Sequence, residues 1–319
     1  MQNSATFFDF FSFALSVTAP AYALVLAGLI LRRLGLIGDR FISWGSKLVF
    51  NVGMPVVLFF GAARADYSMI FTSTYLIAGV VAMLLVVVLA YQYARLRGFP
   101  RAHQGIIAQG AYRSNMGIVG IALCANAYGD VGVALAAVPI AIWTTLYNVI
   151  AVVLLNISLD ADVSPLSMLK GMLTNPLIVG ICSGIAISVA GLTLPSVAFQ
   201  VGSVFTAVFL PFALLCIGGS LSLAALRKSS QETIEACAWR LVLAPVLAVL
   251  LAVVLGVRGV ELGVYYLLVG GPAAAASFVM VVAAGGNGTL AANIVVLSTI
   301  ASSVTVTVGM FLLQALGLI

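Results

Sequence analysis

The sequence has very little charge. Only 7% of its 319 residues are Asp, Glu, Lys or Arg, whereas 63% are hydrophobic and the mean hydropathy is +1.22. A water-soluble domain carries about a quarter charged residues, because its surface must be solvated. The composition therefore excludes a soluble enzyme and predicts a chain that lies mostly in lipid.

The sequence also lacks the residue clusters that metal and redox chemistry need. Its cysteines, Cys124, Cys182, Cys216 and Cys237, stand singly in apolar stretches, so we expect small packing residues and no disulfide framework. A single histidine, His103, without clustered carboxylates excludes a metal site of His and acid ligands. No nucleophile stands beside a buried base or acid, so we expect no enzymatic activity.

Acidic residues are missing from the apolar runs. All 9 of them fall in tails, loops or helix ends. A proton-coupled exchanger usually keeps an intramembrane carboxylate as its relay, so the sequence argues against proton coupling through a buried acid. A sodium site made of hydroxyl and carbonyl oxygens stays open, near Ser298, Thr299, Ser302 and Ser303. No other cofactor is expected.

The apolar runs, divided at charges and turn residues, predict an all-α membrane protein with ten transmembrane helices. Most runs reach about 20 residues, which suits a spanning helix, whereas a barrel strand needs about 10. The expected helices are 10–31, 40–63, 73–93, 104–127, 133–157, 171–190, 196–223, 233–255, 259–284 and 290–316.

The basic residues predict an orientation. Of the 14 Lys and Arg residues, eleven lie in or beside the first, third, fifth and seventh connections. Positive charge resists translocation, so we expect these connections in the cytoplasm and both termini outside the inner (plasma) membrane. Such short clusters do not indicate nucleic-acid binding. The eleven are Arg32, Arg33, Arg40, Lys47, Arg95, Arg97, Arg101, Lys170, Arg227, Lys228 and Arg240.

A shift of 156 residues superposes helix-shaping residues of the two halves. Each half, 1–157 and 171–319, has five expected crossings and is joined to the other by 158–170. Because five is odd, the second half must enter the membrane from the opposite side, which predicts an inverted repeat. The pairs are Pro20 and Pro176, Gly28 and Gly184, Gly35 and Gly191, Leu36 and Leu192, Pro55 and Pro211, Gly129 and Gly285, and Gly132 and Gly288.

Arg113, in the fourth expected helix, is the first candidate for substrate binding. It lies 12 residues beyond Arg101, which corresponds to a depth of about 18 Å at a helical rise of about 1.5 Å per residue. An arginine at mid-depth should face protein or water and meet an acceptor. It could contact an anionic substrate, or it could be satisfied by backbone carbonyls at a helix break or by snorkelling. Ser114 and Asn115 follow it, and Asn115 offers amide donors and an acceptor.

The ninth expected helix contains a signal for a stop and restart. Pro272 lacks the amide that continues a helix, and Gly270 and Gly271 precede it. A restarted helix would direct its free N–H groups into the membrane, where they favour a carboxylate. Close helix packing by small residues is the alternative.

Two further features shape the second, sixth and seventh helices. Asn51 precedes Pro55 by one turn, and Pro211 occupies the repeat-related position, so both prolines are expected to act as kinks or hinges. Gly180 and Gly184 are expected to allow close helix packing.

Five groups of residues, spread in order over nearly the whole chain, carry a resemblance to a known family. They are Arg113-Ser114-Asn115-Met116-Gly117 with Gly120 and Tyr128-Gly129; Asn175-Pro176-Leu177-Ile178; Met54-Pro55; Pro272 with Ser277-Phe278-Val279; and Leu297-Ser298-Thr299. Together they resemble the auxin efflux carrier family, in its bacterial branch that includes malonate and malate carriers.

This resemblance implies a five-plus-five inverted repeat similar to bile-acid sodium symporters. A scaffold, often dimeric, would comprise 10–63 and 171–223, and a mobile transport domain would comprise 73–157 and 233–316. The fourth and ninth helices would be broken and would cross at the substrate. Asn115 would contact a carboxylate there, and Asn51 would face the site from the scaffold.

The sequence departs from the plant carriers at both crossovers. Those carriers place proline where this chain has Ala122 and Ser277, so we expect the breaks to involve Gly117, Gly120 and Pro272 instead. For the same reason the resemblance does not imply an indole-acid substrate.

These observations predict a secondary active or facilitated transporter of small organic anions, mono- or dicarboxylates, that works as a homodimer by elevator-type alternating access. A sodium-coupled symporter is one alternative. A non-transporting sensor, or a lipid- or sterol-binding module, is another, less expected because such modules usually carry a signalling domain. The expected substrate-binding residues are Arg113, Ser114, Asn115, Asn51, Gly271, Pro272 and Ser277.

Overall fold

The computed structural model describes residues 7–64, 74–159, 174, 176–221 and 230–319. The expected 158–170 connection, Asn175, and the basic residues Lys170, Arg227 and Lys228 therefore lie wholly or largely outside the described residues. Within them the chain is helical, and the one β-type contact is an isolated antiparallel bridge between Ser114 and Ala273.

The helices follow one another along the chain, and three short π-helical segments interrupt them. They are α1 Phe7–Arg33, α2 Asp39–Leu48, η1 Val49–Gly53, α3 Met54–Arg64, α5 Thr74–Leu96, α6 Arg101–Tyr112, η2 Met116–Gly120, α7 Ile121–Leu159, α9 Pro176–Val189, α10 Ser196–Ser220, α12 Gln231–Ala238, η3 Trp239–Leu243, α13 Ala244–Val254, α14 Gly259–Val269, α15 Ala275–Ala283 and α16 Gly288–Ala315.

The expectation of an all-α membrane protein is confirmed. Seven helices in the described part of the chain are long and apolar enough to span a bilayer, and α14 and 178–189 are shorter apolar helices. Helical residues occupy each of the ten expected ranges, and α7 covers the end of one range and the whole of the next, with a kink at Gly129. The number of crossings stays a prediction.

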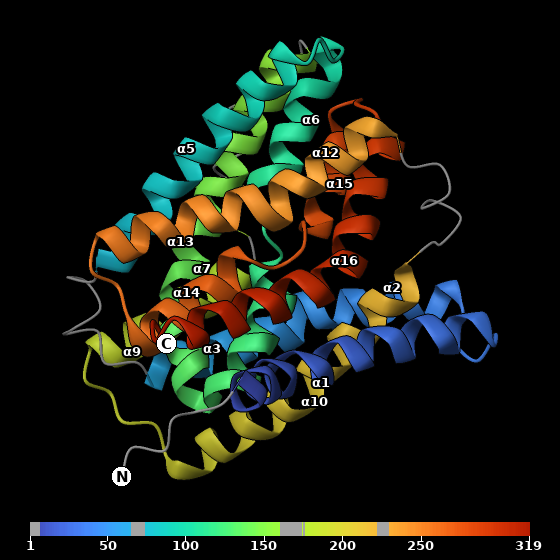
Figure 1. Ribbon diagram of the computed structural model, residues 1–319. Helices are drawn as coiled ribbons and strands as arrows, with labels where there is room; N and C mark the ends of the chain where they lie inside the picture. The colour runs from blue at the N-terminus through green and yellow to red at the C-terminus, as the bar shows by residue number, and fades with distance from the viewer. Residues whose placement is uncertain (1–6, 65–73, 160–173, 175, 222–229) are drawn as a thin grey trace.

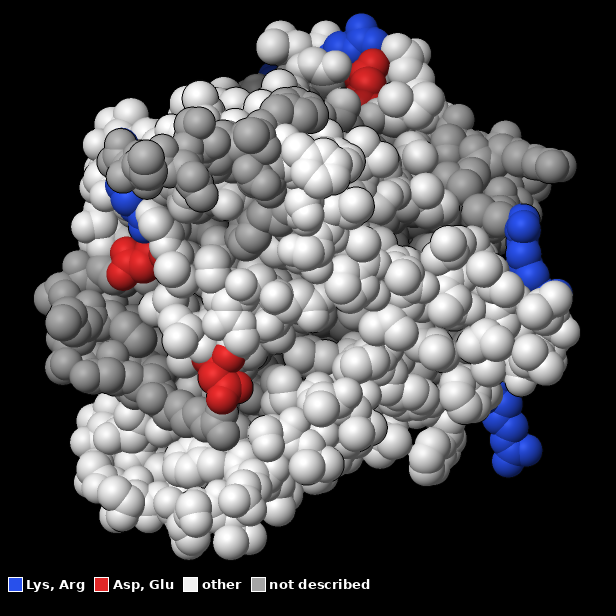
Figure 2. All heavy atoms as spheres, turned by 60° about the horizontal axis from the view of Figure 1, so that its bottom comes forward, with Lys and Arg blue, Asp and Glu red and all other residues white. Residues whose placement is uncertain are grey.

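The outer surface suits lipid. Figure 2 shows a face on which few charged side chains are visible. Large apolar side chains are exposed along the long helices, for example Ile77 on α5, Val204 on α10 and Val304 on α16. An apolar surface of this extent would drive association in water, whereas acyl chains solvate it.

Glycines let two pairs of helices pack closely. α1 lies beside α10, and α3 lies beside α9 (Figure 1). A Cβ on Gly28 or Gly218 would overlap the backbone of the facing helix, α10 or α1 respectively. A Cβ on Gly180 or Gly184 would overlap the backbone of α3, so the expected close packing at these two glycines is confirmed.

In two of the repeat-related glycine pairs, both members have a positive φ. Gly35 and Gly191 have φ of 75° and 65°, and Gly129 and Gly285 have φ of 56° and 75°. All four therefore occupy positions that side-chain-bearing residues rarely adopt. The duplication itself stays a prediction.

The two repeat-related prolines differ. Pro55 lies in the first turn of α3, directly after the π-helical η1, where an extra residue per turn accommodates its missing N–H. α10 runs through Pro211 without an interruption from Ser196 to Ser220. A bend at Pro211 stays a prediction.

Gly218→Ala should destabilise the protein by about 1–3 kcal/mol, because the new methyl group would overlap the Val25 carbonyl of α1. The midpoint of thermal unfolding in detergent measures this. Gly38→Ala is the control, since nothing lies within 4 Å of a Cβ at that position. Equal midpoints for the two variants would contradict the close contact of α1 and α10.

Candidate functional site

Two helices are interrupted, and their interruptions pair with each other. α6 ends at Tyr112 and η2 begins at Met116, while α14 ends at Val269 and α15 begins at Ala275. The Asn115 amide donates to the Pro272 carbonyl oxygen at 2.8 Å, and the Ala274 amide donates to the Arg113 carbonyl oxygen at 3.0 Å. The two helices therefore cross, and we call residues 113–115 and 270–274 the crossover.

The break between α14 and α15 follows from its sequence and from one side chain of another helix. Pro272 lacks an N–H, and the next amide, that of Ala273, donates at 3.0 Å to the Ser298 hydroxyl of α16. This bond replaces the helical partner that Ala273 lost. Pro272 and Gly271 both lie within the crossover, and both are buried.

The break between α6 and η2 lies earlier in the chain than Gly117 and Gly120 indicate. Gly117 and Gly120, the residues at which this break is expected, belong to η2. Ala122 and Ser277, which stand where the plant carriers have proline, also lie in helical turns, of α7 and α15. The helix stops at Arg113 because the backbone of residues 113–115 pairs with the other break. Glycine flexibility alone does not show where a distant partner will bind.

Two restarted helices direct their N-terminal ends at the crossover. η2 starts after Asn115, whose side chain makes no capping hydrogen bond, and α15 starts after Ala274. The first N–H groups of a helix have no partner within it, and the helix dipole places partial positive charge there. Both ends therefore favour a negatively charged group.

Arg113 is buried with neutral partners. Its side chain is 4% exposed; Nη2 donates to Asn148 Oδ1 at 2.6 Å and Nη1 contacts Met280 Sδ at 3.0 Å. No acidic side chain among the described residues forms an ion pair with it. Sequence reasoning did not identify Asn148, although an amide within the apolar run of α7 was a usable signal.

Several polar atoms near the crossover have no hydrogen-bond partner. They include the hydroxyl groups of Ser114 and Ser277 and the Oε1 atom of Gln109, all on buried residues. Asn115 is 9% exposed, and its side chain makes no capping hydrogen bond to η2. Unpaired buried polar groups cost free energy, so their clustering marks a place where a polar ligand would be stabilised.

Arg240 is the second buried arginine, and it lies deeper than a helix end. The sequence grouped it with basic residues in or beside the connections, but it lies in η3, inside the spanning segment 231–254, and is 2% exposed. Its guanidinium donates to the Ala111, Tyr112 and Val269 carbonyl oxygens. The alternative weighed for Arg113, capture by carbonyls at a helix break, is thus realised by Arg240.

The hydroxyl groups considered for sodium already have protein partners. Thr299 donates to the Val295 carbonyl oxygen at 2.7 Å, and Ser302 donates to the Thr299 carbonyl oxygen at 2.8 Å while accepting from Tyr22 at 2.9 Å. Ser298 accepts from Ala273. Sodium binding there stays a prediction.

Asn51, the residue expected to face the site from the scaffold, lies in η1. It is exposed and donates to the Lys47 carbonyl oxygen of α2, the preceding turn of the same continuous helix, at 2.8 Å.

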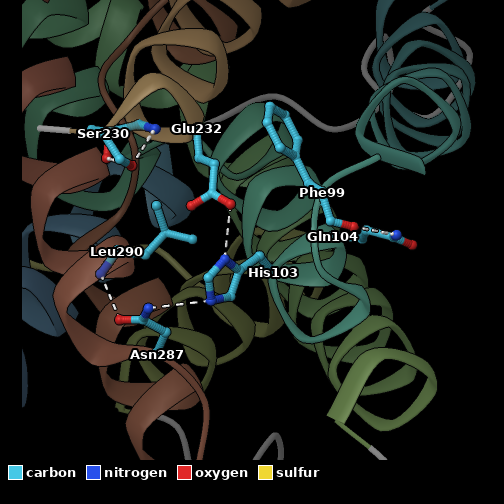
Figure 3. A network of polar contacts seen from close by, with 8 residues as sticks. Phe99, His103, Gln104, Ser230, Glu232, Asn287 and Leu290 are labelled. Atoms are coloured by element: carbon cyan, nitrogen blue, oxygen red, sulfur yellow. Dashed lines mark hydrogen bonds and ion pairs between the residues drawn. The ribbon is translucent and has the colours of Figure 1, made fainter. Parts of the chain in front are cut away.

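A polar network joins α6, α12 and α16 away from the crossover (Figure 3). His103 Nδ1 lies 2.9 Å from Glu232 Oε1, and its Nε2 lies 3.2 Å from Asn287 Nδ2, while Asn287 Oδ1 caps α16. Nearby, Arg97 binds Glu235, and this hydrogen bond raises the pKa of Arg97. The network ties the start of α6, the helix that leads into the crossover, to α12 and to the start of α16.

A multi-pass helical protein with two interrupted, crossing helices and polar groups at their junction is a membrane transporter in its architecture. Residues 13–310 match the membrane transport protein family. The chain therefore belongs to that family, which comprises the auxin efflux carriers. No curated protein matches the chain.

Ser298→Ala should lower the free energy of unfolding by about 1–3 kcal/mol, because it leaves the buried Ala273 N–H without a partner. Thermal unfolding measures the loss. Ser303→Ala is the matched control: both hydroxyls donate to the carbonyl three residues earlier in α16, but only Ser298 has a bond to another element. A Ser303→Ala midpoint as low as that of Ser298→Ala would contradict this role.

Proposed function

We propose that the protein is a secondary active or facilitated transporter of small organic anions, mono- or dicarboxylates, across the inner membrane. The observation that carries this proposal is the buried guanidinium of Arg113 at the crossover, whose side-chain hydrogen-bond partners within the described residues are Asn148 and Met280. Its charge has no acidic partner among the described residues.

The energetics favour an anion over a neutral substrate. An arginine at mid-bilayer costs at least about 2.5–3.5 kcal/mol on insertion scales. A carboxylate bound beside it would offset that cost and accept paired N–H bonds from the planar guanidinium. The N-terminal ends of η2 and α15 add donors of the same polarity. Ser114, Asn115 and Ser277 supply neutral hydrogen-bonding groups that would orient the anion.

We assign substrate movement to an elevator mechanism. The scaffold would comprise α1–α3, α9 and α10, whose close glycine contacts make a rigid unit and through which two copies would form a homodimer. The remaining helices carry the crossover and would move past the scaffold with the bound anion. Both termini would lie outside, because ten of the basic residues still fall in the expected cytoplasmic connections after Arg240 is removed from that group.

Arg113→Ala should reduce carboxylate flux into proteoliposomes by at least about tenfold, equivalent to about 1.4 kcal/mol, because the variant removes the cation that would bind the substrate. Radiolabelled mono- and dicarboxylates report the flux. Asn115→Ala should reduce it by a smaller factor, since an amide contributes neutral hydrogen bonds only.

The matched control is Arg95→Ala, which removes an arginine from the exposed last turn of α5. Its flux should equal that of the unaltered protein. Full flux in both Arg113→Ala and Asn115→Ala would remove the crossover as the substrate site, and ligand binding without flux would favour a sensor.

Flux of a carboxylate with charge −1 should respond to membrane potential when no ion is coupled. An inside-negative potential drives such an anion outward by about 2.3 kcal/mol per 100 mV. Efflux from vesicles with an imposed potassium diffusion potential should therefore accelerate when the interior is made negative. Insensitivity to the potential would instead indicate that a compensating cation such as sodium moves with the anion.

A further inference from the structure

Arg240 gathers the carboxyl-terminal ends of both interrupted helices. Nη1 donates to the Ala111 and Tyr112 carbonyl oxygens at 3.0 Å and 2.7 Å, and Nη2 donates to the Val269 carbonyl oxygen. Tyr112 is the last residue of α6, and Val269 is the last residue of α14. One side chain from a third helix thus binds both of the helix ends that the breaks create.

These carbonyl oxygens would otherwise form a site for a free cation. The last four carbonyls of a helix have no partner within it, and the helix dipole places about half a negative charge there. Two such ends converge on Arg240 and together amount to about one negative charge. Half-helix carboxyl-terminal ends inside membrane transporters coordinate monovalent cations for this reason.

We propose that Arg240 is a positioning residue that acts as a tethered cation. Its guanidinium occupies the place between the two carboxyl-terminal helix ends, holds α6 and α14 together, and neutralises the partial negative charge on that side of the crossover. The amino-terminal ends of η2 and α15 then dominate the field that an anionic substrate meets. This inference deepens the proposed function. Its consequence for the substrate rests on that function, whereas the binding of both helix ends by Arg240 does not.

The surroundings of Arg240 agree with a fixed position. The side chain is 2% exposed, and a cavity of about 20 Å³ lined by Arg240, Tyr112, Tyr147 and Val269, among others, leaves room for about one water. Arg240 lies nine residues beyond Gln231, about 14 Å along the helix, too deep to reach the interface by a small rotation. Within the described residues no acidic side chain competes for it.

The test is chemical rescue of Arg240→Ala in the full-length protein. We expect this variant to unfold at a lower temperature than the unaltered protein and to lose at least about tenfold in carboxylate flux, if the flux depends on the crossover as proposed. Guanidinium chloride at millimolar concentration should raise the unfolding temperature and the flux of this variant, because the free ion fits where the guanidinium was removed. Urea has a similar shape without the charge and should have no such effect.

Controls separate the binding of both helix ends by a guanidinium from general effects of the additives. Guanidinium should leave the unaltered protein and Arg95→Ala unchanged over the same concentrations. Absence of rescue, or equal rescue by urea, overturns the proposal. If the unaltered protein moves no carboxylate, the function proposed above fails. The unfolding temperatures still test whether a cation at the position of Arg240 holds the two helix ends together.

A second pair of variants applies if Arg240→Ala cannot be purified folded. Arg240→Lys keeps the positive charge, whereas Arg240→Gln keeps hydrogen-bond donors without the charge. We expect the lysine variant to be the more stable of the two, because the charge interacts with both helix ends. A glutamine variant at least as stable, or a lysine variant that does not fold, overturns the proposal.

Discussion

The pairing of two chain breaks is the interaction on which the rest of this structure depends. A break in a membrane helix leaves backbone N–H and C=O groups without partners, and lipid offers none. Here residues 113–115 and 272–274 supply those partners to each other through two backbone hydrogen bonds. Neither helix could break alone at this depth without a comparable substitute, so the two interruptions form one unit.

The crossover then has a polarity. Four helix ends meet there: the carboxyl-terminal ends of α6 and α14 and the amino-terminal ends of η2 and α15. Arg240 binds the first pair, while the second pair has no side chain of opposite charge on it among the described residues. Arg113 adds a further positive charge. These groups together are positively charged, and this is the basis on which we propose an anion as the substrate.

The sequence predicted what depends on local composition and depth. The lengths of the apolar runs predicted the helical segments, and Gly-Gly-Pro predicted the interruption that contains Pro272. The depth of Arg113 predicted a buried guanidinium with an acceptor. The sequence did not predict that Arg240 binds both helix ends, because those contacts are to carbonyls 129, 128 and 29 residues away. The start of the first break was missed for the same reason, since its partner lies in the other half of the chain.

In the elevator mechanism proposed above, the crossover and its partners would move as a unit past α1, which contacts α16. Its polar partners, Asn148, Arg240 and Ser298, lie on helices outside α1–α3, α9 and α10. Across the α1–α16 contact, Thr18 bonds Thr307 at 2.6 Å and Tyr22 bonds Ser302 at 2.9 Å. Four residues earlier than these partners, α16 again carries hydroxyl groups, at Ser303 and Ser298. A displacement of one helical turn, about 5.4 Å, would therefore replace each hydroxyl partner with another, and neither α1 hydroxyl would be left unpaired in lipid.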